Sequence, residues 1–152
     1  MKKLELKVPP LLLFLLSIPL MWLVRDQQHE LFSISWLSLL ALFFAVSGLL
    51  IIILAVIEFR RQHTTVDPRD PNQSSTLVCE GIFKVTRNPM YLGFSLLLLA
   101  WGMLLSSMLS LLWVPLFMAY LNQWQIKPEE RLLRQKFPDQ YPAYRQRVRR
   151  WL

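Results

Sequence analysis

The sequence predicts an all-α integral membrane protein, a single domain over residues 1–152 with about four transmembrane helices. The last two helices should form a tight hairpin, and a C-terminal amphipathic helical tail should follow in the cytoplasm. Three observations predict this architecture. Hydrophobic residues make up 54% of the chain and charged residues only 18%, whereas an average soluble domain has about 25% charged residues. The apolar residues form long uncharged runs, and the basic residues are concentrated between and beyond these runs.

The first two uncharged runs predict two spanning helices. We place the first at residues 8–24, near the minimum length for crossing the hydrocarbon core of a bilayer. Pro19 should kink this helix, because proline removes a backbone donor from the helix interior. The second span, 33–57, is the clearest and is long enough to cross with tilt. Within it, Gly48 should allow another helix to approach closely.

Residues 88–126 form a third run, of 39 residues without a charge. As one helix this run would be about 58 Å long, nearly twice the roughly 30 Å of the hydrocarbon core. We therefore expect two spans, 89–105 and 110–126. The least apolar point of the run is Ser106-Ser107, so the turn between the two helices should lie near 105–110.

The charge distribution predicts the topology. With four spans, the N-terminus, the polar segment 59–88 and the tail 127–152 lie on one side of the membrane. All 17 basic residues except Arg25 are on that side, so the positive-inside rule places it in the cytoplasm. We expect the inner (plasma) membrane of a bacterium. The net charge of +7 then indicates anionic lipid headgroups as partners and no nucleic acid.

The tail 127–152 should lie at the membrane surface. It holds eight of the 17 Lys and Arg residues. Lys127-Pro128-Glu129-Glu130 is typical of a helix start, with proline in the first turn and acids where the helix dipole favours them. Four apolar residues further on fall at helical spacing on one face: Tyr141, Tyr144, Val148 and Trp151. Arginines cover much of the rest, a pattern typical of an interfacial helix.

The composition excludes several kinds of site. Cys79 is the single cysteine, so the chain can form neither an intrachain disulfide nor a cysteine-based metal site. His29 and His63 are far apart in the sequence, and no metal is expected. The four glycines form neither a dinucleotide-binding fingerprint nor a P-loop. An enzymatic site would therefore bind its ligand in another way.

A polar cluster stands where segment 59–88 gives way to the third uncharged run. Each member has a structural explanation. Arg87 could anchor the chain at the interface, Asn88 and Pro89 could start a helix, Tyr91 could be an interfacial aromatic, and Gly93 could be a packing glycine. The occurrence of all these residues within seven positions indicates a binding site. The long polar segment that precedes them supports this, because long ordered loops are usually functional.

The motif T-R-N-P-M-Y-L-G at residues 86–93 resembles the R-[HN]-P-x-Y-x-G motif of a family of integral-membrane methyltransferases. These enzymes are related to isoprenylcysteine carboxyl methyltransferase and to phospholipid methyltransferases. Upstream, S-T-L-V-C-E-G-I-F at 75–83 is similar to the family's T-L-V-x-x-G-x-[YF] segment. Downstream, Glu129-Glu130 opens an ending similar to E-E-x-x-L-x-x-x-F-G-x-x-Y-x-x-Y. The resemblance covers about residues 60–152.

The resemblance implies S-adenosylmethionine as the cofactor. It also implies transfer of the methyl group to a lipid-like or membrane-embedded acceptor, through a carboxylate, amine or thiol, at the cytoplasmic face. Carried over position by position, the cofactor-binding residues are Ser75, Thr76, Leu77, Val78, Phe83, Asn88, Pro89, Met90, Tyr91 and Glu129. The catalytic group is Arg87, Tyr91 and Glu130, and Glu130 could replace Glu129 as a cofactor ligand.

The chain departs from the family pattern at three positions. Asn88 stands where the carboxyl methyltransferases have His, Pro138 where the family has Gly, and Gln125 about where those enzymes have an Arg thought to meet the substrate. The resemblance therefore does not specify a prenylcysteine carboxylate as the acceptor. Two other functions remain open, an NADPH-dependent membrane reductase of the sterol-reductase type and a non-catalytic membrane scaffold whose basic tail binds anionic lipid.

Overall fold

The computed structural model describes residues 6–25, 36–62 and 76–152, and all regular structure in these ranges is helical. The all-α prediction is thus confirmed for this part of the chain. The elements are α1 (Pro10–Leu23), α2 (Trp36–Arg61), the 3-10 helix η2 (Gly81–Lys84), α3 (Pro89–Leu104), α4 (Met108–Leu121), the π-helical turn η3 (Asn122–Ile126), α5 (Lys127–Lys136) and α6 (Gln140–Arg147).

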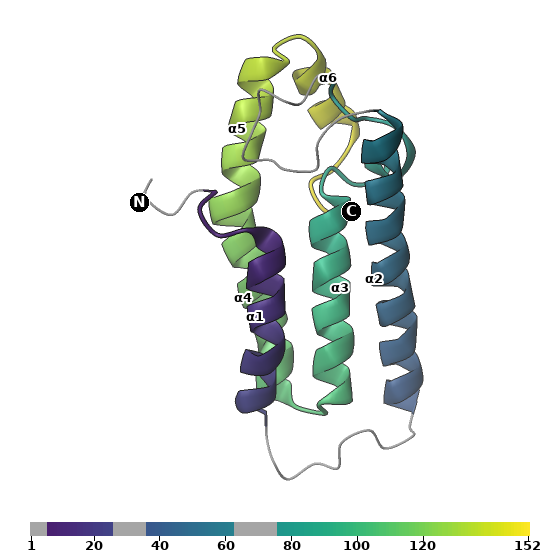
Figure 1. Cartoon of the computed structure of the whole chain (residues 1–152), viewed down its shortest axis with the longest axis vertical. Coiled ribbons are helices and arrows are strands. Elements are labelled where there is room, and N and C mark those ends of the chain that lie inside the picture. Colours follow the sequence, from purple (N-terminus) through teal and green to yellow (C-terminus); the bar gives the residue numbers. More distant parts are fainter. Residues whose placement is uncertain (1–5, 26–35, 63–75) are drawn as a thin grey trace.

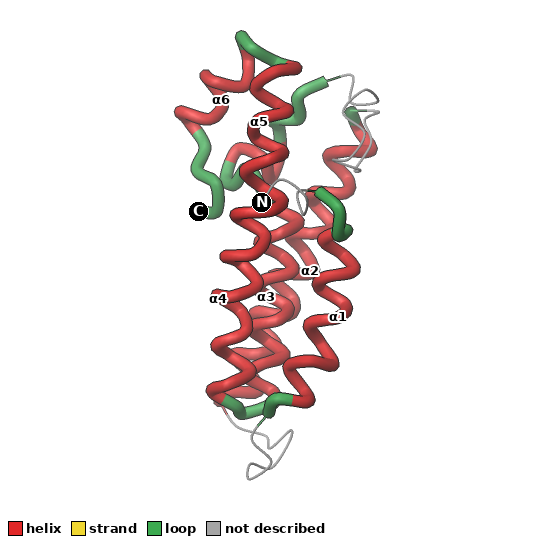
Figure 2. The backbone as a smooth tube through the Cα atoms, turned by 90° about the vertical axis from the view of Figure 1, so that its left-hand side faces the viewer, coloured by secondary structure: helices red, strands yellow, loops and turns green. Residues whose placement is uncertain are grey.

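Helices α1 to α4 lie side by side as a bundle, and α5 and α6 stand beyond one end of it (Figures 1 and 2). By length and composition α2 is able to cross a membrane, whereas α1 and α3 are shorter apolar helices. Large apolar side chains of α1, α2 and α4 point outward, on α2 among them Leu39, Leu42, Phe43, Leu49 and Leu50. An exterior of this kind is the surface that lipid would cover.

The closest approach in the bundle is between α2 and α3. A Cβ on Gly48 would lie 2.8 Å from the carbonyl oxygen of Gly93, and a Cβ on Gly93 would lie 2.5 Å from Cγ1 of Ile52. Neither glycine could carry a side chain without separating the helices, because small residues are what let helix backbones meet. The expected packing role of Gly48 is confirmed.

The α3–α4 hairpin turns at residues 105–107, inside the range that the sequence predicts. Ser106 adopts φ 50°, and the Ser107 hydroxyl accepts a hydrogen bond from the amide of Ser110 (3.4 Å) at the start of α4. Ser110 Oγ in turn donates to the carbonyl of Met21 (2.8 Å) in the last turn of α1. A C-terminal carbonyl that α1 cannot satisfy itself therefore finds its partner inside the bundle.

The expectation of a separate helix start at Lys127 is wrong. Helices α4, η3 and α5 follow one another without a break, and Ile126 before α5 is itself helical. Pro128 does not end the helix, because the carbonyl left without its usual amide, that of Trp124, accepts a hydrogen bond from the backbone N–H of Leu6 (3.1 Å). The fourth predicted span, 110–126, is consequently the first part of a longer helix.

The expected interfacial face of the tail is also corrected. Tyr141, Tyr144 and Val148 are buried and pack against Leu77 and Cys79, so the protein itself covers this face. The tail reverses after α6, since Val148 has an extended backbone (ψ 132°). Residues 149–152 therefore run back toward the bundle instead of continuing a surface helix.

Candidate functional site

The reversed C-terminal segment lies against the motif at residues 86–93. The backbone N–H of Arg87 donates to the carbonyl of Arg149 (3.0 Å). The carbonyl of Arg150 accepts two hydrogen bonds, from Thr86 Oγ1 (3.3 Å) and from Asn88 Nδ2 (2.8 Å). Asn88 stands at the N-cap position of α3, yet its side chain makes no cap hydrogen bond. Its amide instead fixes the C-terminal segment.

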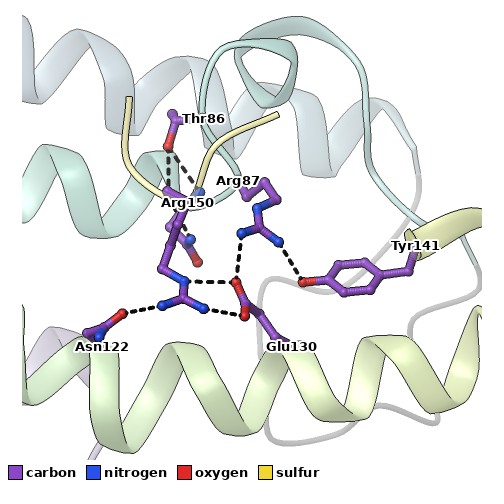
Figure 3. Close-up of polar contacts among 7 residues, drawn as sticks. Thr86, Arg87, Asn122, Glu130, Tyr141 and Arg150 are labelled. Carbon is purple, nitrogen blue, oxygen red and sulfur yellow. Dashed lines mark hydrogen bonds and ion pairs between the residues drawn. The ribbon is translucent and has the colours of Figure 1, made fainter. Parts of the chain in front are cut away.

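Glu130 of α5 is held by two arginines from different parts of the chain (Figure 3). Arg150 contacts it through two parallel hydrogen bonds, Nε to Oε1 (3.0 Å) and Nη2 to Oε2 (2.6 Å). Arg87 Nη2 lies 3.1 Å from Oε1. Such bidentate, charge-assisted contacts are strong and directional. They connect the motif, α5 and the C-terminal segment at one carboxylate.

The network extends beyond the three charged groups. Arg150 Nη1 donates to Asn122 Oδ1 in η3 (2.8 Å), and Arg87 Nη1 donates to the hydroxyl of Tyr141 in α6 (3.2 Å). The Arg87 side chain is only 9% exposed. Its Nε is buried and has no hydrogen-bond partner among the described residues. A buried N–H of this kind is costly unless a ligand or water satisfies it.

Glu129 forms a second polar contact next to the network. The Tyr91 hydroxyl, one turn into α3, donates to Oε1 of Glu129. Burial raises the pKa of Glu129 to about 7, the hydrogen bond from Tyr91 opposes this rise, and the charge of Glu130 adds to it. Within the described residues, no hydrogen bond reaches the other carboxylate oxygen of Glu129. Glu129 is therefore more available than Glu130 to bind a ligand.

The remaining residues predicted to bind the cofactor lie in several different environments. Val78 and Phe83 are buried in an apolar cluster with Ala55, against which Met90 packs. Leu77 packs against the tyrosines of α6. Pro89 is buried in the first turn of α3, and Thr76 is exposed. Ser75 lies outside the described residues.

Arg150 and Asn122 complete the network. The sequence places Arg150 in the ending that resembles the family but gives neither residue a role in the site. The charge pattern of the tail does not distinguish Arg150 from its neighbour Arg149, because both follow a helix that itself ends in arginines. Only the reversal after Val148 turns one of them toward Glu130. Gln125, at the position of the family's substrate-contacting Arg, is buried and donates to the carbonyl of Val8 (2.6 Å). Its side chain thus fixes the entry into α1.

Comparison with known proteins places this geometry in a family. Residues 36–140, more than half of the chain, match the phospholipid methyltransferase family. The chain belongs to that family. Its resemblance to isoprenylcysteine carboxyl methyltransferase-like enzymes is thereby confirmed. A chain of this family is expected to be a membrane methyltransferase, and α2 supplies a helix able to cross the membrane.

One relative and the solved structures add little about activity. An uncharacterized protein of Haemophilus influenzae (strain ATCC 51907 / DSM 11121 / KW20 / Rd) is 49% identical over 63 residues, which are 41% of this chain and all of that protein. No solved structure gives a significant match. The family and the geometry of the site therefore point to the function.

Proposed function

We propose that this family member is an S-adenosylmethionine-dependent methyltransferase acting on a lipid-like or membrane-embedded acceptor. The observation that carries the proposal is the contact between Tyr91 and Glu129. It joins the family's R-N-P-x-Y motif to its Glu-Glu pair, two sequence features 38 residues apart, in a partly buried polar site. A scaffold would have no need of a partly buried carboxylate at this place, one oxygen of which accepts no hydrogen bond from the described residues.

The residues present fit a cofactor that carries both an ammonium and a carboxylate. Glu129 would hold the ammonium or the ribose hydroxyls, because both oxygens of Glu130 already bind arginines. The buried Nε of Arg87, which has no acceptor within the described residues, is a donor for an anionic group. Glu129 and Arg87 would thus provide opposite charges to the two ends of an amino-acid group.

When bound, S-adenosylmethionine supplies a methyl group already activated by a sulfonium, so its transfer needs no acid catalyst. The protein's contribution is then alignment and exclusion of water. Tyr91 orients the Glu129 carboxylate through its hydrogen bond. The Arg87–Glu130–Arg150 network holds the start of α3 at a fixed distance from α5. The Tyr91 ring is also a suitable surface beside a cationic sulfonium.

We place the site at the cytoplasmic face of a bacterial inner membrane. Support comes from the basic residues, which all lie on one side of the expected topology except Arg25. Leu6 and Val8 contact Trp124 and Gln125, so the start of the chain lies at the same end of the bundle as the site. The apolar exterior of the bundle supports an acceptor that arrives from the lipid phase.

Titration calorimetry in nanodiscs tests the proposal. We expect the full-length protein to bind S-adenosylmethionine with a dissociation constant in the micromolar range, on the order of −8 kcal/mol. Glu129→Ala and Tyr91→Phe should weaken binding about tenfold or more, because each removes half of the Tyr91–Glu129 contact. Glu80→Ala is the matched control, since that carboxylate is 61% exposed and its ion pair among the described residues is with Lys84.

The outcomes separate the competing functions. If the folded protein did not bind S-adenosylmethionine, the proposal would be wrong. Equal weakening by Glu80→Ala and Glu129→Ala would remove Glu129 from the site. A nicotinamide nucleotide bound to the purified protein would favour the reductase instead. Transfer of a labelled methyl group to extracted bacterial lipids would then identify the acceptor.

A further inference from the structure

A basic pocket of about 260 Å³ lies between α5 and α6, beside the proposed cofactor site. Its lysine and arginines have no part in the cofactor proposal. It is lined by Lys127, Glu130, Arg131, Arg134, Tyr141 and Arg145. Four of these six side chains are cationic. The one carboxylate, Glu130, is already paired with two arginines outside this lining. A concave surface with this excess of positive charge attracts anions.

Several of the lining groups are available to a ligand. Arg134 and Arg145 are exposed, and neither forms a hydrogen bond or ion pair within the described parts of the chain. The Lys127 ammonium donates one hydrogen bond to Gln123 Oε1 (2.6 Å), so two of its N–H groups are left for a ligand. The hydroxyl of Tyr141 accepts from Arg87 and keeps its own proton to donate. Two arginine forks and two further donors therefore face one space.

The pocket lies at the level expected for lipid headgroups. Lys127 is the first charged residue after the uncharged run 88–126. Arg134 is seven residues further along the same helix, about 10 Å by the rise of an α-helix. The headgroup layer on each side of a bilayer is roughly 5–8 Å deep. A pocket that begins at Lys127 and ends at Arg134 thus spans this layer.

We propose that this pocket binds the phosphate of one anionic glycerophospholipid. Planar guanidinium forks match phosphate oxygens bidentately, which makes arginine well suited to this ligand. The volume of about 260 Å³ far exceeds the roughly 10–15 Å³ that holds one water molecule, so it admits a phosphate with its ester groups and leaves the acyl chains in the bilayer. This site requires membrane insertion but no methyl transfer, and Glu129 and Tyr91 are absent from its lining.

The proposal differs from general attraction of a basic tail to an anionic membrane. Arg147 and Arg149 are also exposed, but they do not line the pocket. Diffuse attraction depends on the number of charges near the surface, whereas a pocket depends on which charges are removed. Two double variants of equal net charge therefore distinguish the two cases.

Native mass spectrometry of the full-length protein, released from nanodiscs, provides the test. With phosphatidylglycerol we expect one retained lipid per protein. Arg134→Gln/Arg145→Gln should reduce its retention at least tenfold, and Arg147→Gln/Arg149→Gln should change it less than twofold. Phosphatidylcholine, which has no net charge, should be retained at least tenfold less than phosphatidylglycerol. Circular dichroism confirms that each variant is folded, and Arg134→Lys/Arg145→Lys, which keeps the charge without the forks, should show intermediate retention.

Other results would overturn the proposal. Equal losses in the two double variants would mean diffuse attraction. Equal retention of both lipids would mean that the pocket does not select a headgroup with a net negative charge. Inorganic phosphate at millimolar concentration should not displace the lipid. Its displacement of phosphatidylglycerol would assign the pocket to a soluble anion instead.

Discussion

Replacement of Arg150 by alanine should destabilise the protein by about 2–3 kcal/mol. The change removes the bidentate contact with Glu130 and the hydrogen bond to Asn122, while the backbone carbonyl keeps its bonds to Thr86 and Asn88. Loss of one partner of a fully buried ion pair costs about 3–5 kcal/mol, and loss of an exposed pair about 0–1 kcal/mol. The two side chains are 27% and 14% exposed, and Arg87 still neutralises Glu130, so an intermediate value is expected.

Unfolding in mixed detergent micelles, followed by circular dichroism, measures this effect. Arg149→Ala is the control, because it removes the same charge one residue away and leaves its backbone contact with Arg87 intact. It should change the free energy of unfolding by less than about 0.5 kcal/mol. In a double-mutant cycle with Glu130→Gln, Arg150→Ala should show a coupling energy of about 1–2 kcal/mol.

Two results would refute this reasoning. If Arg150→Ala and Arg149→Ala had the same effect, the contacts of the Arg150 guanidinium would contribute nothing beyond its charge. If the Arg150→Ala and Glu130→Gln effects were additive, the C-terminal segment would not be fastened to α5 through this pair.

Three further predictions follow from other contacts. Because the pKa of Glu129 is raised to about 7 in the folded protein, its contribution to stability is complete below pH 4.5 and is lost as the pH rises through 7. The free energy of unfolding of the wild-type protein should therefore fall by about 3 kcal/mol between these pH values, and Glu129→Gln should abolish this fall. Unfolding at each pH measures the effect. Gly93→Val should lower the free energy of unfolding by about 3 kcal/mol, because its Cβ would lie 2.8 Å from the Gly48 carbonyl oxygen. A thermal midpoint equal to that of the wild type would contradict the close approach of α2 and α3. Gly81→Ala should lower the free energy of unfolding by about 1–2 kcal/mol, since residue 81 has φ 57° and its Cβ would meet the Glu58 carboxylate. Lys84→Ala, in the same 3-10 helix, is the control and should leave the thermal midpoint unchanged.

The hairpin and the packing glycine could be predicted because their causes are local. A run of 39 residues is too long for one crossing, and its most polar point is where α3 ends. Gly48 is the one glycine of its helix, and glycine in an apolar helix usually marks a close approach. The motif at 86–93 was likewise visible, because its unusual residues are adjacent in the sequence.

The continuity of α4 and α5 could not be predicted, because its cause is distant in the sequence. Pro128 would normally begin or end a helix, and the Leu6 amide that compensates for its missing N–H is more than a hundred residues away. Similarly, the apolar face of α6 has the pattern of an interfacial helix. The segment that covers it, near Leu77, contains apolar residues that favour packing, but nothing in the sequence pairs them with α6.

The unbroken helix from Met108 to Lys136 would carry any change of tilt in the bundle directly to the site. Its first half belongs to the apolar bundle, and its second half carries Glu129. A thinner bilayer increases helix tilt. A tilt of about 10° relative to α3, pivoting at Pro115, would displace Glu129 by about 4 Å, because these residues are roughly 21 Å apart along the axis. Such a displacement would break the hydrogen bond from the Tyr91 hydroxyl to Glu129. The π-helical turn η3 lies between Pro115 and Glu129, where the helix departs from regular α-helical geometry.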